Sequence, residues 1–236
     1  DWRDRREAPS HMRRRERMIV AIDGPAGVGK STVAKLLASR LGFLYLDTGA
    51  LYRAVAWAVL DQRLEPGDAE AVAGLLAKLS LQMQVTKNDV AVFVNGKDVT
   101  KELRTPAVSA AASVVSAIPA VRAWLLPVQR QIGQKGNVVA EGRDIGTKVF
   151  PAAPVKFFLE ADPTVRAQRR HLELVAAGHR SALEQTSAEL AGRDDRDRSR
   201  SMAPLIPAQD AHHIDTSSLS AEEVVNQMSA VVTAKL

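Results

Sequence analysis

Short apolar runs alternate with stretches of helical period along most of the chain. Five runs have the length and β-branched content of buried strands, at 18–22, 43–46, 137–141, 155–159 and 212–215. Between the first two, Val33, Leu37 and Leu41 recur at helical spacing, and Gly42 follows as a helix-ending residue. Strands separated by helices are typical of a parallel sheet flanked by helices. The pattern therefore predicts an α/β fold with a five-stranded parallel sheet.

A different pattern interrupts this alternation after the second strand. Residues 81–100 alternate apolar and polar positions with period two. The alternation is broken at Asn88-Asp89 and at Asn95-Gly96, which are both typical hairpin turns. This pattern predicts a small antiparallel insert.

Two prolines then stand where helices can begin. Pro106 and Pro119 predict helices at 107–117 and 119–132. A chain of 236 residues with 46% hydrophobic content can bury the core of one large domain. We expect a single domain over 18–236, with its core at 18–60 and 134–236 and the insert at approximately 61–133.

Charge is concentrated at the start of the chain. The net charge is +5, and residues 1–17 contain seven arginines and four acids, which leaves only +2 for the rest. These residues have no apolar periodicity, so we expect a disordered basic arm or a tag. The nearly balanced body argues against nucleic-acid binding.

Composition excludes several kinds of site. The absence of cysteine excludes disulfides, thiolate zinc sites and cysteine nucleophiles, and it fits a reducing, cytoplasmic setting. No apolar run is long enough to cross a membrane, and we expect no membrane association.

The stretch GPAGVGKST lies between the first predicted strand and the first predicted helix. Its spacing matches the nucleotide-binding P-loop, in which glycines let backbone N–H groups point at phosphate oxygens. Lys30 supplies a cation, and the hydroxyl of Ser31 can ligate Mg²⁺. We therefore expect ATP to bind at Gly24, Pro25, Ala26, Gly27, Val28, Gly29, Lys30, Ser31 and Thr32.

A second anion site is predicted beside the P-loop. DTGALYR (47–53) follows the second strand, where Thr48, the backbone of Gly49 and Arg53 can hold a phosphate. A P-loop followed by Thr-Gly and this arginine resembles the nucleoside monophosphate kinases. Within them, DTGALYRAVA, EGRDIGTKVFP, APVKFFLEA and RDDRDRSRSMAPL closely resemble the bacterial cytidylate kinases. The likeness covers nearly all of 18–236.

The resemblance implies a P-loop NTPase fold whose insert binds a nucleoside monophosphate and whose lid lies at approximately 166–185. It implies phosphoryl transfer from ATP to CMP or dCMP, with Mg²⁺, in pyrimidine nucleotide metabolism. By resemblance, Thr48, Gly49, Arg53, Arg143 and Arg200 contact the substrate phosphate, Arg193 and Asp197 the ribose, and Ser113, Arg122 and Asp144 the base. Thr48 stands where some members have Ser, and Glu141 where some have Asp.

Two arginine groups have an ordinary alternative. Arg193, Asp197 and Arg200 fall on one helix face, and such a run is usually a solvated, self-paired surface. Here a triphosphate and a monophosphate need more cations than Lys30, and guanidinium groups bind phosphate well. Arg166, Arg169 and Arg170 lie within one helical turn, which is typical of an exposed basic helix. By resemblance they form a lid, with Arg169 on ATP and catalytic roles for Lys30, Arg143, Arg166, Arg170 and Arg200.

The expected chemistry needs no general base, because a phosphate monoester is largely dianionic at neutral pH. A regulatory GTPase is excluded, since no Asn is followed by Lys and no Asp stands three residues before a Gly. The alternatives are a small kinase acting on UMP, AMP or an alcohol, and a nucleic-acid-binding protein that uses the arginines as a phosphate track. We expect a monomer that acts on small molecules, and no role for His171, His212 or His213.

Overall fold

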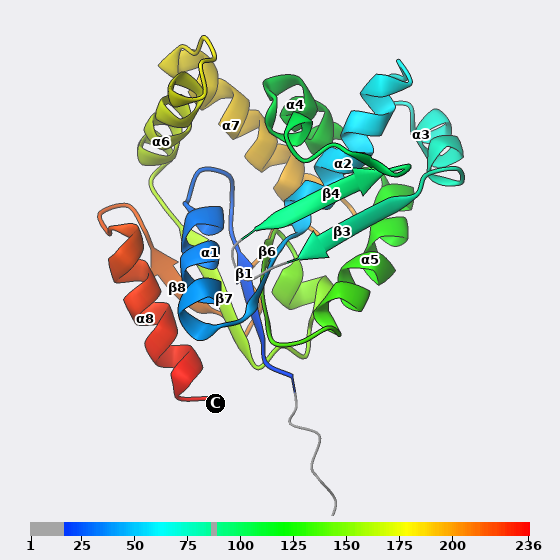
Figure 1. The fold of residues 1–236 in the computed structure, drawn as a ribbon. Coiled ribbons are helices and arrows are strands. Elements are labelled where there is room, and N and C mark those ends of the chain that lie inside the picture. Colours follow the sequence, from blue (N-terminus) through cyan, green and yellow to red (C-terminus); the bar gives the residue numbers. More distant parts are fainter. Residues whose placement is uncertain (1–16, 86–88) are drawn as a thin grey trace, which may run out of the picture.

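A computed structural model describes residues 17–85 and 89–236. Its main sheet contains five parallel strands in the order β2-β6-β1-β7-β8 (Figure 1). The strands are β1 (Ile19–Asp23), β2 (Leu44–Asp47), β6 (Val138–Gly142), β7 (Val155–Glu160) and β8 (His212–Asp215). The predicted five-stranded parallel sheet is confirmed. Most of the basic arm expected at the start of the chain lies outside the described residues.

Four of the five strands extend one residue beyond the apolar runs that predicted them. The added residues include Asp23, Asp47 and Glu160, which pair through the backbone with Gly142, Glu141 and Asp215 respectively. Ladder hydrogen bonds use the backbone, so a hydrophobic pattern does not report them. The extra residues bring carboxylates to the carboxyl edge of the sheet, where ligands bind in such folds.

Helices cover the sheet and rise above its carboxyl edge (Figure 1). They are α1 (Lys30–Leu41), α2 (Thr48–Asp61), α3 (Ala69–Leu76), α4 (Pro106–Val115), α5 (Pro119–Gly133), α6 (Pro163–Ala176), α7 (Leu183–Ser199) and α8 (Ala221–Thr233). Helices α1 and α8 lie side by side, with α1 against β6 and α8 against β7. The two helices predicted from their leading prolines are confirmed as α4 and α5.

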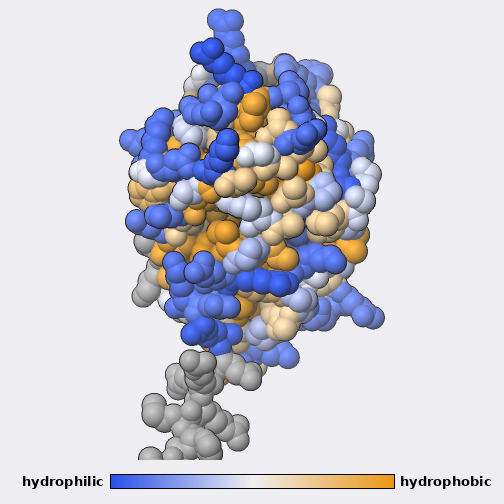
Figure 2. All heavy atoms as spheres, turned by 90° about the vertical axis from the view of Figure 1, so that its right-hand side faces the viewer, coloured by the Kyte–Doolittle hydropathy of each residue, from blue (hydrophilic) through white to orange (hydrophobic). Residues whose placement is uncertain are grey.

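The predicted antiparallel insert is a three-stranded sheet of β3 (Leu81–Val85), β4 (Val90–Val94) and β5 (Lys97–Asp98). Asn95 and Gly96 form its second turn with φ angles of 49° and 82°, both in the left-handed region that a tight hairpin requires. Asn88, in the first predicted turn, lies outside the described residues. Figure 2 shows apolar side chains gathered between hydrophilic ones on the side of the molecule where this sheet, α3 and α5 lie.

Helices α2 and α4 pack against each other above the sheet. Both bury several alanines, namely Ala50, Ala54, Ala56 and Ala58 of α2 and Ala111 and Ala112 of α4. Small side chains allow the two helices to approach closely. Among the described residues no single helix is long and apolar enough to cross a membrane, and α4 with α5 reaches that length only as a pair bent by 102°.

Candidate active site

A cleft of about 220 Å³ opens above the carboxyl edge of the sheet. The segments that follow β1, β2 and β6 form its floor, and α2, α4, α6 and α7 contribute its walls. Parallel strands direct their carboxyl ends to the same edge, so three segments that are distant in sequence meet here. The cleft therefore brings together the phosphate loop, the segment at Thr48 and the segment at Arg143.

Backbone geometry at the phosphate loop requires glycine. Gly24, Gly27 and Gly29 have φ angles of 149°, 79° and 87°. A Cβ on Gly24 would lie 2.3 Å from the carbonyl oxygen of Leu159, and a Cβ on Gly27 would lie 3.0 Å from Arg166. Gly29 is the N-cap of α1 and offers no side chain, so the first N–H groups of the helix are left for a ligand.

Lys30 lies inside this loop with only 6% of its surface exposed. Its Nζ donates a hydrogen bond to the carbonyl oxygen of Pro25 at 2.5 Å. Burial and the nearby Arg143 lower the pKa of Lys30 well below its usual value, and Glu141 and Asp23 oppose that shift. The ammonium group is therefore held beside the phosphate site, where an anion would stabilise its charge.

Oxygen ligands for a divalent cation lie next to Lys30. Glu141 is buried near the end of β6, close to Ser31, and accepts a hydrogen bond from Tyr45 at 2.5 Å. Burial and Asp47 raise the pKa of Glu141 above its usual value. Residues 17–85 and 89–236 hold no cluster of three His, Asp or Glu side chains that could bind a metal alone. The hydroxyl and carboxylate oxygens fit Mg²⁺ that is shared with phosphate and water.

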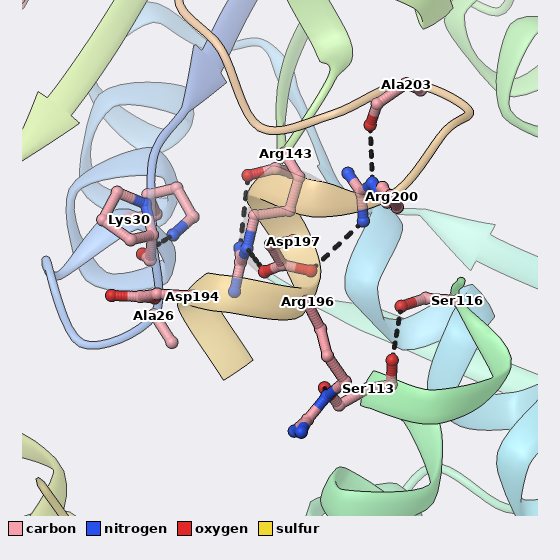
Figure 3. A network of polar contacts seen from close by, with 12 residues as sticks. Ala26, Lys30, Ser113, Ser116, Arg143, Asp194, Arg196, Asp197, Arg200 and Ala203 are labelled. Carbon is pink, nitrogen blue, oxygen red and sulfur yellow. Dashed lines mark hydrogen bonds and ion pairs between the residues drawn. The ribbon is translucent and has the colours of Figure 1, made fainter. Parts of the chain in front are cut away.

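Two arginines, Arg143 and Arg200, bond to Asp197 on the opposite side of the cleft (Figure 3). Arg143 Nε donates to Asp197 Oδ2 at 3.0 Å, and Arg200 Nη1 donates to Oδ1 at 3.2 Å. Burial would raise the pKa of Asp197, but Arg143, Arg193 and Arg200 together hold it below its usual value. Burial and the adjacent Arg143 lower the pKa of Arg193 to about 9. Arg200 caps α7 rather than belonging to it, yet it still points to the same carboxylate.

Several of these guanidinium groups have buried donors without a protein partner. Arg53 Nε, Arg193 Nε and Arg200 Nη2 are each buried and make no hydrogen bond within the described part of the chain. Arg53 is otherwise paired with Asp47 at 2.6 Å. Leaving a buried donor unpaired costs about 1–3 kcal/mol. Donors that belong to residues lining one cleft and lack protein partners are typical of an anion-binding site.

The far end of the cleft carries one buried ion pair. Arg122 Nη2 donates to Asp144 Oδ2 at 2.6 Å, and its Nη1 donates to the carbonyl oxygen of Ser116 at 3.0 Å. Its guanidinium carbon lies 5.2 Å from the ring centre of Tyr52. This end therefore presents an acceptor, a donor and an aromatic face, which are the groups that recognise a heterocyclic base.

Comparison with known proteins identifies the family. A sequence profile described as cytidylate kinase matches residues 20–234. The chain belongs to the cytidylate kinase family. It is 48% identical to the cytidylate kinase of Geobacter sulfurreducens, covering 92% of this chain and 94% of the relative. It is 46% identical to the cytidylate kinase of Geobacillus sp., covering 94% and 99% respectively.

Some members of the cytidylate kinase family belong to longer proteins. The chain is 50% identical to part of a bifunctional pantoate ligase/cytidylate kinase of Synechococcus elongatus, over 90% of its own length. It spans 41% of that relative's length.

The three arginines of α6 that were expected to form a lid in this cytidylate kinase family member contact different groups. Arg166 donates to the carbonyl oxygen of Ala26 at 3.1 Å and pairs with Asp194 at 2.7 Å. Arg169 donates to the hydroxyl and carbonyl oxygens of Thr216 and does not line the cleft. Only Arg170 lines it. The sequence placed all three within one helical turn, but it could not show which protein groups each one contacts.

One expected base-contacting residue lies outside the cleft lining of this family member. The hydroxyl of Ser113 accepts a hydrogen bond from Arg196 at 3.1 Å, and Ser113 is 4% exposed. Ser109 and Ser116, about one turn away on either side, line the cleft instead. The other residues predicted to contact the substrate line the cleft, namely Thr48, Gly49, Arg53, Arg122, Arg143, Asp144, Arg193, Asp197 and Arg200.

Sequence reasoning also gave no role to Tyr45, Tyr52 and Asp23, which lie in or beside the site of this family member. Tyr45 resembles an ordinary core position inside an apolar run, but its hydroxyl contacts Glu141. Tyr52 lines the cleft, and only its place one residue before Arg53 could have suggested it. Asp23 is a carboxylate between an apolar strand and the phosphate loop, which was a usable signal.

Proposed function

We propose that this chain transfers the γ-phosphoryl group of ATP to CMP, and also to dCMP, in pyrimidine nucleotide metabolism. The observation that carries the proposal is a single cleft with a phosphate loop on one side and unpartnered guanidinium donors on the other. Phosphoryl transfer between two nucleotides needs both anions in one place, with their charge neutralised. Membership of the cytidylate kinase family supports the same conclusion.

The donor side is built from residues 24–32, which include Lys30. Backbone N–H groups and the Lys30 ammonium bind the β- and γ-phosphates of ATP. Ser31 would hold Mg²⁺ together with ATP phosphates and water, and the ion would neutralise charge on the donor. Arg166 orients α6 against the phosphate loop through Ala26, and Arg170 reaches the cleft from the same helix.

The acceptor side holds CMP by its three parts. The phosphate binds Thr48, Gly49, Arg53, Arg143 and Arg200, and Arg193 and Asp197 hold the ribose. Arg143 and Arg200 stabilise the charge that develops on the transferred group. The dianionic acceptor phosphate attacks without a base, which fits a cleft whose acidic groups are mostly paired with arginine.

The surrounding elements have roles in this proposal. The insert at approximately 61–133 contributes α4 to the acceptor pocket, and the segment at approximately 166–185 acts as a lid that excludes water. Arg169 contributes to ATP binding when the lid closes. We expect the chain to work in the cytoplasm as a monomer on small-molecule substrates, without nucleic-acid or membrane partners.

Base selectivity tests the proposal. A coupled assay of ADP release is run with CMP, dCMP, UMP, AMP and GMP at saturating Mg-ATP, and CMP and dCMP are expected to be preferred. Cytosine offers an amino donor beside a ring acceptor, so a carboxylate at Asp144 and a guanidinium at Arg122 suit it, whereas uracil reverses both groups. A preference for AMP or UMP contradicts the proposal.

Asp144→Asn is the matching variant, because it keeps the shape of the side chain and removes the carboxylate. We expect the ratio of kcat/KM for CMP to that for UMP to fall by at least about tenfold, the size expected for losing a hydrogen bond to a charged group. Asp98→Asn, which changes an exposed carboxylate bonded to Thr100 in the insert sheet, is the control. An unchanged ratio in Asp144→Asn removes Asp144 from base recognition.

A further inference from the structure

Asp23 is a buried carboxylate that the proposed reaction does not use. It is the last residue of β1, directly before Gly24 of the phosphate loop, and only 3% of its surface is exposed. Its two oxygens accept the backbone N–H groups of Ile145 and Gly146, each at 2.8 Å. Asp23 is not part of the cleft lining, so any role in the reaction is exerted through its neighbours.

The two N–H groups belong to the turn that follows Asp144. This turn, Ile145–Val149, is a single π-helical turn, and its first N–H groups have no carbonyl partner inside it. Both residues are buried, so removal of the carboxylate would leave two buried donors unpaired. Asp144 itself has a backbone conformation outside the regular regions, with φ −146° and ψ 27°. The direction of the Asp144 side chain therefore depends on how Ile145 and Gly146 are held.

Packing around the turn leaves little room for it to move. A Cβ on Gly146 would lie 3.4 Å from Asp23 Oδ2 and 3.1 Å from Lys156 Cδ. Lys156 is itself fixed by hydrogen bonds to the carbonyl oxygen of Pro151 and to Asp210. The turn is thus held between the end of β1 and β7.

We propose that Asp23 is a positioning residue that fixes the Asp144 carboxylate, and with it the base pocket, relative to the phosphate loop. One side chain joins the two halves of the site, because its backbone begins the donor loop and its carboxylate holds the acceptor turn. The inference rests on the proposed function, since it assigns the base contact to Asp144.

The test is Asp23→Asn, measured as the ratio of kcat/KM for CMP to that for UMP. Asparagine has one acceptor oxygen, and its amide group would face the second N–H. We expect the ratio to fall about fivefold or more. The double variant Asp23→Asn/Asp144→Asn is expected to have a ratio no lower than Asp144→Asn alone, because residues that act through one group are not additive. Asp68→Asn, another aspartate that accepts a backbone N–H, is the control.

A merely structural role gives a different result. If Asp23→Asn lowers the CMP and UMP efficiencies equally and leaves their ratio unchanged, the inference is wrong. If the variant does not fold, Gly146→Ala decides, because it keeps the carboxylate and presses the turn away from Lys156, and Gly74→Ala serves as its control. A lowered ratio in Gly146→Ala supports the inference, and an unchanged ratio overturns it. A wild-type enzyme without a preference for CMP over UMP instead contradicts the proposed function, and the inference falls with it.

Discussion

Lys30 is preorganised to bind an anion. Its ammonium group is buried and bonded to the carbonyl oxygen of Pro25, so little rearrangement is needed when a phosphate binds. The same burial lowers its pKa, which means that the charged form is less stable here than in water. Lys30 therefore stabilises the complex with phosphate and destabilises the folded protein without ligand.

Lys30→Met should separate activity from stability. We expect kcat to fall at least about a hundredfold, the usual size for losing one preorganised donor to a transition state. The melting temperature should stay the same or rise, because a buried charge is removed. Lys35→Met, in the same helix but paired with Asp89, is the control. Near-normal turnover in Lys30→Met would show that the phosphate loop has been misassigned.

At the scale of elements, the sequence predicted the type and the order of the helices and strands well. It predicted the residues at which the strands end less well. Strands β1, β2, β6 and β7 were found because their interiors are apolar, and α4 and α5 were found because proline favours the first turn. The carboxyl ends of the strands were missed by one residue, since Asp23, Asp47 and Glu160 continue the ladder through backbone atoms. These are the positions that bring carboxylates to the edge of the sheet where ligands bind.

The cap of α8 gives a prediction at this scale. Ser220 and Glu223 form a capping box at its start, in which each side chain accepts a hydrogen bond from the other residue's backbone N–H. Ser220→Ala should lower the free energy of unfolding by about 1 kcal/mol, measured by urea denaturation. Activity should be unchanged, because α8 does not line the cleft. Ser229→Ala, inside the same helix, is the control. A loss of activity in Ser220→Ala without loss of stability would contradict the assignment.

At the scale of the whole molecule, the cleft gathers more positive charge than its carboxylates neutralise. Arg193 is the clearest case, because burial and Arg143 lower its pKa to about 9 and its Nε has no partner among the described residues. An anion that binds there stabilises the folded state by mass action, by about 2.7 kcal/mol at a concentration a hundred times its Kd.

Thermal unfolding can measure how much an anion bound in the cleft stabilises the folded protein. CMP should raise the melting temperature clearly, and cytidine, which lacks the phosphate, should raise it much less at the same concentration. Without ligand, Arg193→Met should have a higher melting temperature than the unchanged protein. The increase in melting temperature on adding CMP should be smaller for Arg193→Met. Equal shifts with CMP and cytidine would mean that the arginines do not hold the phosphate.

The sequence predicted the residues of the cleft better than their partners. Arg193, Asp197 and Arg200 were placed on one face, and all three line the cleft. Arg169 and Ser113 were given ligand roles, but in the structure Thr216 and Arg196 bond to them. A motif identifies residue types and spacing, whereas the partner of each polar group depends on elements far away in the sequence. That is why Asp23, whose partners lie more than a hundred residues away, had no assigned role.

The alanines buried in α2 and α4 have a consequence for mutational scanning. These helices carry Tyr52, Arg53 and Ser109 into the cleft, and their close approach depends on side chains that are already small. An alanine scan passes over such positions without changing them, so it would report a wall of the acceptor pocket as tolerant. Enlargement to leucine or valine would instead force the helices apart, at a typical cost of 1–3 kcal/mol per site. Only a scan that adds volume can measure how strongly the spacing of these two helices constrains the pocket.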